Sequence, residues 1–267
     1  MEQIDILNLL KIAAEAGDAV MEVYNTSFTY KHKEDCSPLT LADKRSNEII
    51  TQRLQEAYPD IPIISEESKS IPYETRSRWE EFWLVDPLDG TKEFIKRNGE
   101  FTVNIALIDN NVPVAGVVYV PVTKTFYFAR KDFGSYKFVD DGKVQAAKDI
   151  QEITASACRL PEGPEGRAFT VVTSRSHISK ETMEYTNELR QKHGTVEVIA
   201  CGSSLKLCMV AEGKADIYPR LGPTSEWDIA AAHAVVKEAG RGVYSYHSGE
   251  EFTYNKESLR NEWFIVS

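Results

Sequence analysis

The alternation of strand-like and helix-like segments in the second half of the chain most constrains how it can fold. Apolar strand-like runs and helix-like segments follow one another at residues 169–173, 179–193, 196–200, 203–212, 215–219 and 228–239. Such alternation is typical of helices layered on a sheet, because each element must bury one apolar face against a neighbour. The sequence therefore predicts an α/β fold.

The first half combines long helices with several strands. Apolar residues at helical spacing predict a helix over 4–24, and a second helix is expected from Thr40 to Tyr58, ended by Pro59. A short helix is expected at 90–97, and strands at 61–64, 82–85, 101–109, 114–120 and 125–129. Residues 140–166 are richer in Gly, Pro and charge. We therefore expect an α+β half over 1–150 and an α/β half over 151–267.

Charge and cysteine usage restrict the partners and the compartment. The formal net charge of -10 disfavours binding to a nucleic acid polymer, whereas a small anion can still bind where cations reverse the sign locally. The four cysteines form no C-x-x-C pair, which argues against a zinc ribbon or a disulfide framework.

The chain carries no sign of export or of a membrane span. Residues 1–10 lack the basic start of a secretory signal, and the most apolar stretch, 112–122, is short and broken by prolines. We expect a cytoplasmic protein without an integral membrane segment. A peripheral association with the inner membrane and the oligomeric state stay open.

The strongest chemical signal is the string Asp86-Pro-Leu-Asp89-Gly-Thr91. Two carboxylates three residues apart on a tight turn can point to one side, and the Leu88 carbonyl between them can face the same way. Such oxygens suit Mg²⁺. Gly90 permits close backbone approach, and the N–H groups of Gly90 and Thr91 would point at an anion if they open a helix. Alone, the string is more often an ordinary Asp-Pro turn.

Two further acidic segments change that balance. Glu66 and Glu67 follow a short apolar run, and Asp228 follows Trp227 at the start of a helix. Each has an ordinary explanation, a solvated loop for the glutamates and a favourable helix dipole for Asp228. Three acidic strand or helix ends in one α/β chain nevertheless favour a shared metal cluster, because clustered carboxylates repel one another unless cations neutralise them.

These three motifs, in this order, resemble the signatures of the inositol monophosphatase superfamily over nearly the whole chain. The resemblance implies an α/β fold of the inositol monophosphatase and sugar phosphatase type, a layered αβαβα sandwich. Inositol monophosphatases typically continue the central motif with Thr-Asn-Phe, whereas this chain has Lys92-Glu93-Phe94. That continuation, and the strings at 174–177, 202–206 and 218–224, look like the 3′(2′),5′-bisphosphate nucleotidase branch, the CysQ type of bacteria.

The resemblance implies a Mg²⁺-dependent, commonly lithium-sensitive phosphomonoesterase. It would hydrolyse adenosine 3′,5′-bisphosphate to AMP and phosphate in sulfur assimilation, with phosphoadenosine phosphosulfate as a second candidate substrate. An inositol or other sugar phosphatase of the same superfamily is the alternative. A non-catalytic sensor on a phosphatase scaffold is a third hypothesis, against which the intact acidic set argues.

The resemblance also implies roles for single residues. Two or three Mg²⁺ ions would be bound by Glu66, Asp86, the Leu88 carbonyl, Asp89 and Asp228. Asp43 and Thr91 match the pair that orients and deprotonates the attacking water in the family, and Glu67 would support the same water or an extra metal. For Asp43 the alternative is a capping box with Thr40 at the start of its helix.

Substrate contacts are expected from both halves of the chain. The resemblance assigns them to Glu66, Leu88, Asp89, Gly90, Thr91, Ser203, Ser204, Lys206, Arg220 and Asp228. A helix start can hold a phosphate or a ribose. The alternatives are a Gly-Ser helix cap with a surface lysine, and a surface position for Arg220. The segment 174–177 is a weaker candidate for the rim of the substrate site.

Overall fold

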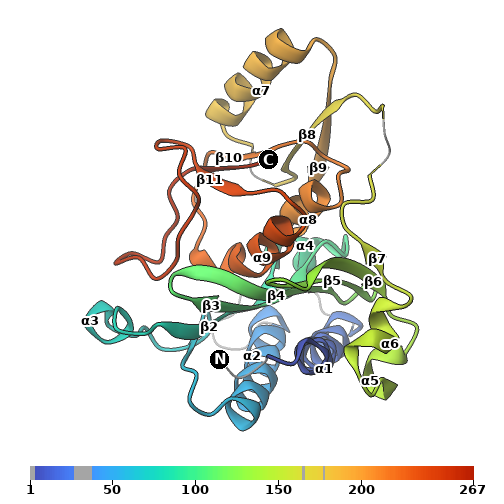
Figure 1. Cartoon of the computed structure of the whole chain (residues 1–267), viewed down its shortest axis with the longest axis vertical. Coiled ribbons are helices and arrows are strands. Elements are labelled where there is room, and N and C mark those ends of the chain that lie inside the picture. Colours follow the sequence, from blue (N-terminus) through green and yellow to red (C-terminus); the bar gives the residue numbers. More distant parts are fainter. Residues whose placement is uncertain (1–3, 27–37, 164–165, 177) are drawn as a thin grey trace.

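The computed structural model describes residues 4–26, 38–163, 166–176 and 178–267, and the helices and strands of these residues stack in alternating layers (Figure 1). A pair of helices covers one face of a seven-stranded sheet, and two further helices separate this sheet from a second one. Another helix lies outside the second sheet. The predicted αβαβα sandwich is confirmed.

The outer helical layer consists of α1 (Ile6–Tyr24) and α2 (Pro38–Ala57). The Asp5 carboxylate caps α1 by accepting from the Leu7 N–H at 2.9 Å, and the apolar face of α1 is buried. Helix α2 begins at Pro38, a favourable first helical residue, so Thr40 lies inside the first turn. The predicted capping box of Thr40 and Asp43 is therefore wrong. The polar residues 31–38 before this helix predict an exposed loop, and most of them lie outside the described residues.

The large sheet follows the chain strand by strand. Its members are β1 (Ile63–Ser65), β2 (Glu81–Asp89), β3 (Thr102–Asp109), β4 (Val112–Val120), β5 (Thr125–Arg130), β6 (Gly134–Val139) and β7 (Cys158–Arg159). Only β1 and β2 pair in parallel, and every other neighbour is antiparallel. Short turns join β3 to β4, β4 to β5 and β5 to β6, because antiparallel neighbours need no crossover connection.

Several short elements were not predicted from the sequence. They are β6, β7, α3 (Tyr73–Arg76), α5 (Lys143–Ala146) and α6 (Ile150–Thr154). Apart from β6, which has six residues, each spans only two to five residues, so tertiary contacts rather than local periodicity specify it. The division of the chain near residue 150 stays a prediction.

The central helical layer is formed by α8 (Leu205–Ala211) and α9 (Ala230–Glu238), which follows the 3₁₀ turn η1 (Glu226–Asp228). Helix α9 is rich in alanine and packs against β3, β4 and β5. The contact with β4 is so close that a Cβ on Gly116 would collide with the carbonyl oxygen of Ala231. The helix predicted at 228–239 is thus confirmed from Ala230 onwards.

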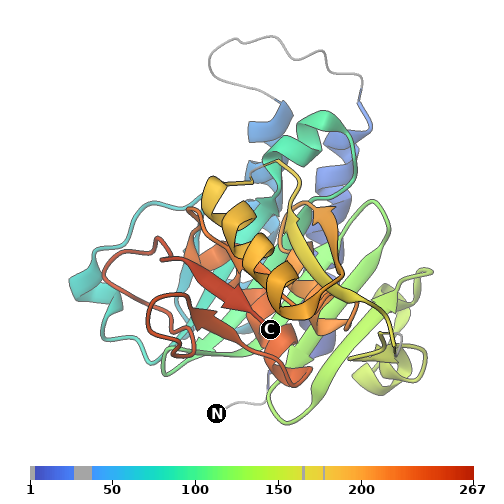
Figure 2. The ribbon, with the colours of Figure 1, turned by 90° about the horizontal axis from the view of Figure 1, so that it is seen from above.

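The second sheet is shorter and mixed. Strands β8 (Phe169–Ser174) and β9 (Val196–Cys201) pair in parallel, and β10 (Tyr218–Arg220), β12 (Phe264–Val266) and β11 (Val243–Ser245) pair antiparallel. A parallel bridge between Val171 and Ile217 connects the two groups. Figure 2 looks onto α7 (Lys180–His193), which packs on β8, β9 and β10. Strands β11 and β12, three residues each, were not predicted.

Candidate active site

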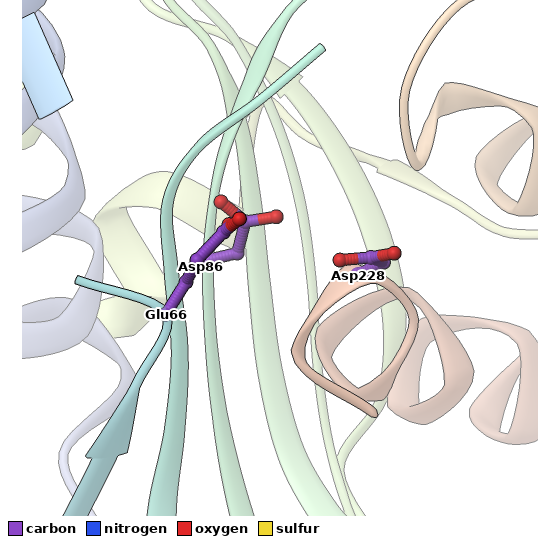
Figure 3. A group of neighbouring side chains, drawn as sticks. All are labelled: Glu66, Asp86 and Asp228. Carbon is purple, nitrogen blue, oxygen red and sulfur yellow. The ribbon is translucent and has the colours of Figure 1, made fainter. Parts of the chain in front are cut away.

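Three of the predicted acidic residues meet at the ends of β1, β2 and η1. Glu66 directly follows β1, and the parallel pairing of Ser65 with Val85 places it beside Asp86 on β2. Asp228 ends η1 and approaches from the central helical layer. One carboxylate oxygen from each of Glu66, Asp86 and Asp228 lies within 4.8 Å of the others (Figure 3). These three predicted ligands therefore form one cluster.

The local backbone explains how the side chains of Asp86 and Asp89 can both point towards the cluster. The sequence predicts a tight turn here, but β2 continues through Asp89, and its pairing with β3 shifts register between Asp86 and Asp89. Such bulges re-aim side chains. The Leu88 N–H donates to Asp86 Oδ1 at 3.1 Å, and the Leu88 side chain is buried in an apolar cluster. The Leu88 side chain is therefore not available to a ligand.

Gly90 joins this strand end to the short helix α4 (Thr91–Lys96), which confirms the helix predicted at 90–97. The φ of Gly90 is +92°, in a region that other residues rarely adopt. A Cβ on Gly90 would lie 3.0 Å from the Glu100 carbonyl oxygen. Thr91 is the first helical residue and is exposed. The chain after Asp89 must therefore turn through a glycine.

Asp89 is held by residues from the second half of the chain. Its Oδ2 accepts hydrogen bonds from Ser203 Oγ at 2.6 Å and from the Ser204 N–H at 2.7 Å. Burial raises the pKa of Asp89, while the nearby Lys206 ammonium opposes that increase. Lys206 Nζ in turn donates to the Ser203 carbonyl oxygen. Asp89 thus links the acidic cluster to the turn at residues 202–204, which we call the serine turn.

Burial and then mutual repulsion raise the pKa values of the carboxyl groups in this cluster. Burial, followed by the neighbouring carboxylates, raises the pKa of Asp86 well above its usual range. Burial and the Asp89 carboxylate raise the pKa of Asp228 to about 7, and burial also raises the pKa of Glu66. Closely spaced hard oxygens whose charges repel one another suit a divalent cation, which would relieve the repulsion. The cluster could therefore hold a metal ion.

Asp43 faces the same cluster from α2. It is buried, and its pKa is raised to about 8 by burial and then by the charges of Glu67 and Glu66. Helix α2 packs against both β2 and α4, the elements that carry Asp86 and Thr91. Glu67 is exposed beside Glu66. The structure therefore places Asp43 and Glu67 next to the acidic cluster.

A cleft of about 190 Å³ lies between α4, the 202–206 segment and η1. Eight of the predicted site residues line it: Asp89, Gly90, Thr91, Ser203, Ser204, Lys206, Arg220 and Asp228. Ser174, the weaker candidate, lines it too, whereas His177 lies outside the described residues. The predicted substrate contacts are thus largely gathered around one opening.

The cleft also includes residues that sequence reasoning did not assign. Glu93 was noted only as part of the family motif, and it is buried with its carboxylate accepting from Ser176 Oγ at 2.7 Å. Leu207 and Ile229 also line the cleft. Their apolar side chains at helical spacing carry a signal for a core position only, so the sequence offered no means of finding them.

The serines do not act as the helix cap that was the alternative. Helix α8 begins at Leu205, and the Ser204 side chain makes no capping bond. Ser204 Oγ instead donates to Asn104 Oδ1 at 3.0 Å, and Thr102 Oγ1 lies 2.6 Å from Ser203 Oγ. Both side chains are thus held by β3 at the floor of the cleft.

Arg220 is half-buried rather than a surface residue, and its Nη2 donates to the Pro223 carbonyl at 2.7 Å. It also borders a second hollow of about 500 Å³, which shares Ser174 and Tyr218 with the cleft. This hollow is lined mainly by the segment that leads into α7, including Ile178, and by β10 with the segment after it, including Leu221. The cleft thus continues into a less polar space.

The chain is similar to known proteins over nearly its whole length. The model of the inositol monophosphatase family matches residues 3–262. The chain is 44% identical over 262 residues to a protein of Salmonella typhimurium named 3′(2′),5′-bisphosphate nucleotidase CysQ, covering 96% of this chain and 97% of that one. The protein of the same name from Escherichia coli K12 is also 44% identical over 262 residues, with the same coverage.

Solved structures give the same picture. A crystal structure of CysQ from Bacteroides thetaiotaomicron superposes with a TM-score of 0.90 at 46% identity, covering 97% of this chain and 95% of that one. An inositol monophosphatase from Zymomonas mobilis superposes with a TM-score of 0.73 at 20% identity, covering 97% and 91%, and supports the fold alone. Among the described residues, no helix combines the length and apolarity that crossing a membrane requires.

Proposed function

The chain belongs to the inositol monophosphatase family, and on this premise we propose that it is a 3′(2′),5′-bisphosphate nucleotidase. It hydrolyses adenosine 3′,5′-bisphosphate to AMP and phosphate in sulfur assimilation. The observation that carries the proposal is the cluster of Glu66, Asp86 and Asp228. The chain also matches, over nearly their whole length, relatives that bear this name. Phosphoadenosine phosphosulfate is a second candidate substrate.

Mg²⁺ is the proposed cofactor, with two or three ions in the site. They would be held by Glu66, Asp86, the Leu88 carbonyl, Asp89 and Asp228. When bound, Mg²⁺ polarises the phosphoryl group, lowers the pKa of a water molecule and stabilises the leaving oxygen. The protein itself supplies the oxygen donors and their fixed spacing, and no covalent nucleophile is required.

Proton transfer is proposed to involve Asp43 and Thr91. Thr91 lines the cleft, and Asp43 lies behind the two glutamates on a helix that packs against α4. The Thr91 hydroxyl would accept a hydrogen bond from the attacking water and pass a proton to the Asp43 carboxylate. Glu67, exposed next to Glu66, would orient the same water or hold an extra ion.

Substrate recognition is proposed to use the basic side of the cleft. Lys206 and Arg220 would offset the negative charge of the phosphates, while Ser203 and Ser204 offer hydroxyl groups. Gly90 would let the backbone approach the substrate closely. Glu66, Leu88, Asp89, Thr91 and Asp228 would contact the substrate around the metal ions. The adjoining hollow beside Tyr218 has room for a nucleoside.

A phosphate-release panel tests the proposal. Purified protein is assayed with adenosine 3′,5′-bisphosphate, phosphoadenosine phosphosulfate, AMP and inositol phosphate, with Mg²⁺ and with a chelator. We expect Mg²⁺-dependent turnover of the bisphosphate and little turnover of the others except the phosphosulfate. Much faster cleavage of inositol phosphate would instead support a sugar phosphatase.

A pair of matched variants separates an enzyme from a sensor. Asp89→Asn removes the charge of a proposed ligand and should lower turnover by about a hundredfold or more. Asp60→Asn, at an exposed position between α2 and β1, makes the same chemical change away from the cleft and should leave turnover unaltered.

The cytoplasmic location expected from the sequence, and peripheral membrane association, remain proposals.

A further inference from the structure

An ion pair joins two segments of the cleft wall that are far apart in the chain. Glu100, in the connection from α4 to β3, pairs with Arg175, which follows β8. The contact is bidentate, with Arg175 Nε and Nη2 each 2.7 Å from a Glu100 carboxylate oxygen. The side chains are 44% exposed for Arg175 and 23% exposed for Glu100. Neither residue lines the cleft itself.

The same two side chains also bind the backbone of Ala200 and Gly202, where the chain enters the 202–204 turn. Glu100 Oε2 accepts the Gly202 N–H at 2.9 Å, and Arg175 Nη2 donates to the Ala200 carbonyl at 2.6 Å. The Arg175 N–H donates to the Cys201 carbonyl at 3.1 Å. The side chains of the ion pair therefore hold Ala200 and Gly202, and the backbone of Arg175 holds Cys201 between them.

The backbone of Glu100 is wedged between two glycine turns of the site. Its carbonyl oxygen lies 3.0 Å from the position of a Cβ on Gly90 and 2.8 Å from the position of a Cβ on Gly202. A Cβ on Gly202 would also lie 2.6 Å from the Cγ of Glu93. The turn after Asp89 and the turn before Ser203 thus meet at the Glu100 backbone.

The turn that follows Gly202 needs such support. Ser203 has a φ of +54°, a left-handed conformation that is sparsely populated for residues other than glycine and persists where surrounding contacts hold it. In this conformation Ser203 Oγ and the Ser204 N–H both reach Asp89 Oδ2. A small rotation of the turn would withdraw both donors from Asp89 and both serines from the cleft.

We propose that Glu100 and Arg175 are positioning residues that hold the 202–204 turn in place and so set the affinity for the substrate. The inference rests on the proposed function, because it assigns the serine turn to substrate binding. A surface ion pair of ordinary kind contributes little to stability, since solvent screens both charges. An effect of Glu100 on substrate binding that exceeds its effect on unfolding therefore identifies positioning.

The test uses Glu100→Ala, Arg175→Ala and the double variant of the full chain. We expect KM for adenosine 3′,5′-bisphosphate to rise about tenfold in each, with kcat changed by less than about threefold. The double variant should be no worse than Glu100→Ala, because both changes release the same turn. The melting temperature should fall by no more than about 2 °C.

The matched control is Glu15→Ala, which breaks the equally bidentate pair of Arg53 and Glu15 between α1 and α2. The two side chains of this pair are 48% and 43% exposed. We expect KM to be unchanged. An equal rise of KM in Glu15→Ala, or additive effects of Glu100→Ala and Arg175→Ala, would overturn the inference.

Amide hydrogen exchange supplies a readout that needs neither metal nor turnover. In metal-free, substrate-free Glu100→Ala, the amides of residues 202–204 should exchange about tenfold faster, while those of β2 and β3 stay protected. Unaltered exchange at 202–204 would refute the positioning role. If the wild-type protein does not cleave adenosine 3′,5′-bisphosphate, the proposed function fails, and the exchange experiment alone decides whether Glu100 holds the turn.

Discussion

Removing one charge from the acidic cluster should stabilise the metal-free protein while destroying its activity. The change Asp228→Asn keeps the side-chain shape, and the amide oxygen can still accept the Ser225 N–H that Asp228 Oδ2 accepts at 2.9 Å. What disappears is a carboxylate that burial and the neighbouring Asp89 disfavour in its charged form. The prediction therefore isolates the electrostatic cost of the cluster.

The magnitude follows from the pKa of Asp228, which rises from 3.8 to about 7 on folding. A difference of about three pH units, at about 1.4 kcal/mol each, sets an upper limit of about 4 kcal/mol. We expect about half of it, roughly 2 kcal/mol, because the other carboxyls adjust their protonation when one charge is removed. For a chain of this size that is a rise of about 4–8 °C in melting temperature.

The difference in stability between Asp228→Asn and the wild type depends on pH. Because the folded state holds the proton of Asp228 more tightly, the wild-type protein loses stability as pH rises from 3.8 towards about 7, and the loss is complete above that range. The asparagine cannot ionise, so its advantage should be absent near pH 4 and full at pH 8. The measurement is thermal or urea unfolding of both proteins with EDTA at these two pH values.

Saturating Mg²⁺ should make the wild-type protein more stable than Asp228→Asn. Binding to the native state stabilises the wild-type protein in proportion to the logarithm of the ion concentration, whereas the variant lacks one proposed ligand. Turnover of Asp228→Asn should fall by about a hundredfold or more. An Asp228→Asn protein that is no more stable than the wild type with EDTA at pH 8 would refute the reasoning that burial and neighbouring carboxylates disfavour the charged form of Asp228.

Three further outcomes are expected. Lys206→Ala should raise KM about tenfold with a smaller effect on kcat, measured by phosphate release at varied substrate concentration. Gly202→Ala should destabilise the protein by about 1–3 kcal/mol because its Cβ would lie 2.8 Å from a carbonyl oxygen, whereas Gly222→Ala, with open space around it, should not. Glu212→Gln should lower the urea midpoint and cost about 3 kcal/mol, because buried Glu212 accepts from Lys137 at 2.7 Å; an unaltered midpoint would contradict this.

Local periodicity carried enough information for the long elements of the fold. The apolar spacing of residues 4–24 led to α1, and the apolar runs led to β3, β4, β5 and β8 with ends displaced by no more than a few residues. The start of α2 was misplaced because Pro38, not Thr40, opens that helix. The short strands β11 and β12 were missed because three residues carry no measurable period and depend on their partners in the sheet.

The sequence likewise predicts some features of the candidate site and not others. The strand end at Asp86–Asp89 was recognised by its residues, but its shape was predicted as a tight turn and is a bulged strand. The ion pair of Glu100 and Arg175 could not be anticipated, since a glutamate and an arginine 75 positions apart look like two surface charges. Their importance appears only when both are seen around Gly202.

By itself, the sequence determined which atoms are available for chemistry: hard carboxylate oxygens at the ends of predicted strands and helices, and the motifs that place the chain in its family. Only the tertiary structure decided which of them meet. Parallel pairing brings Glu66 beside Asp86, and close packing of the layers brings Ser203 to Asp89 across 114 positions. Spacing along a chain specifies direction within one element, whereas distances between elements are set by how their buried faces pack.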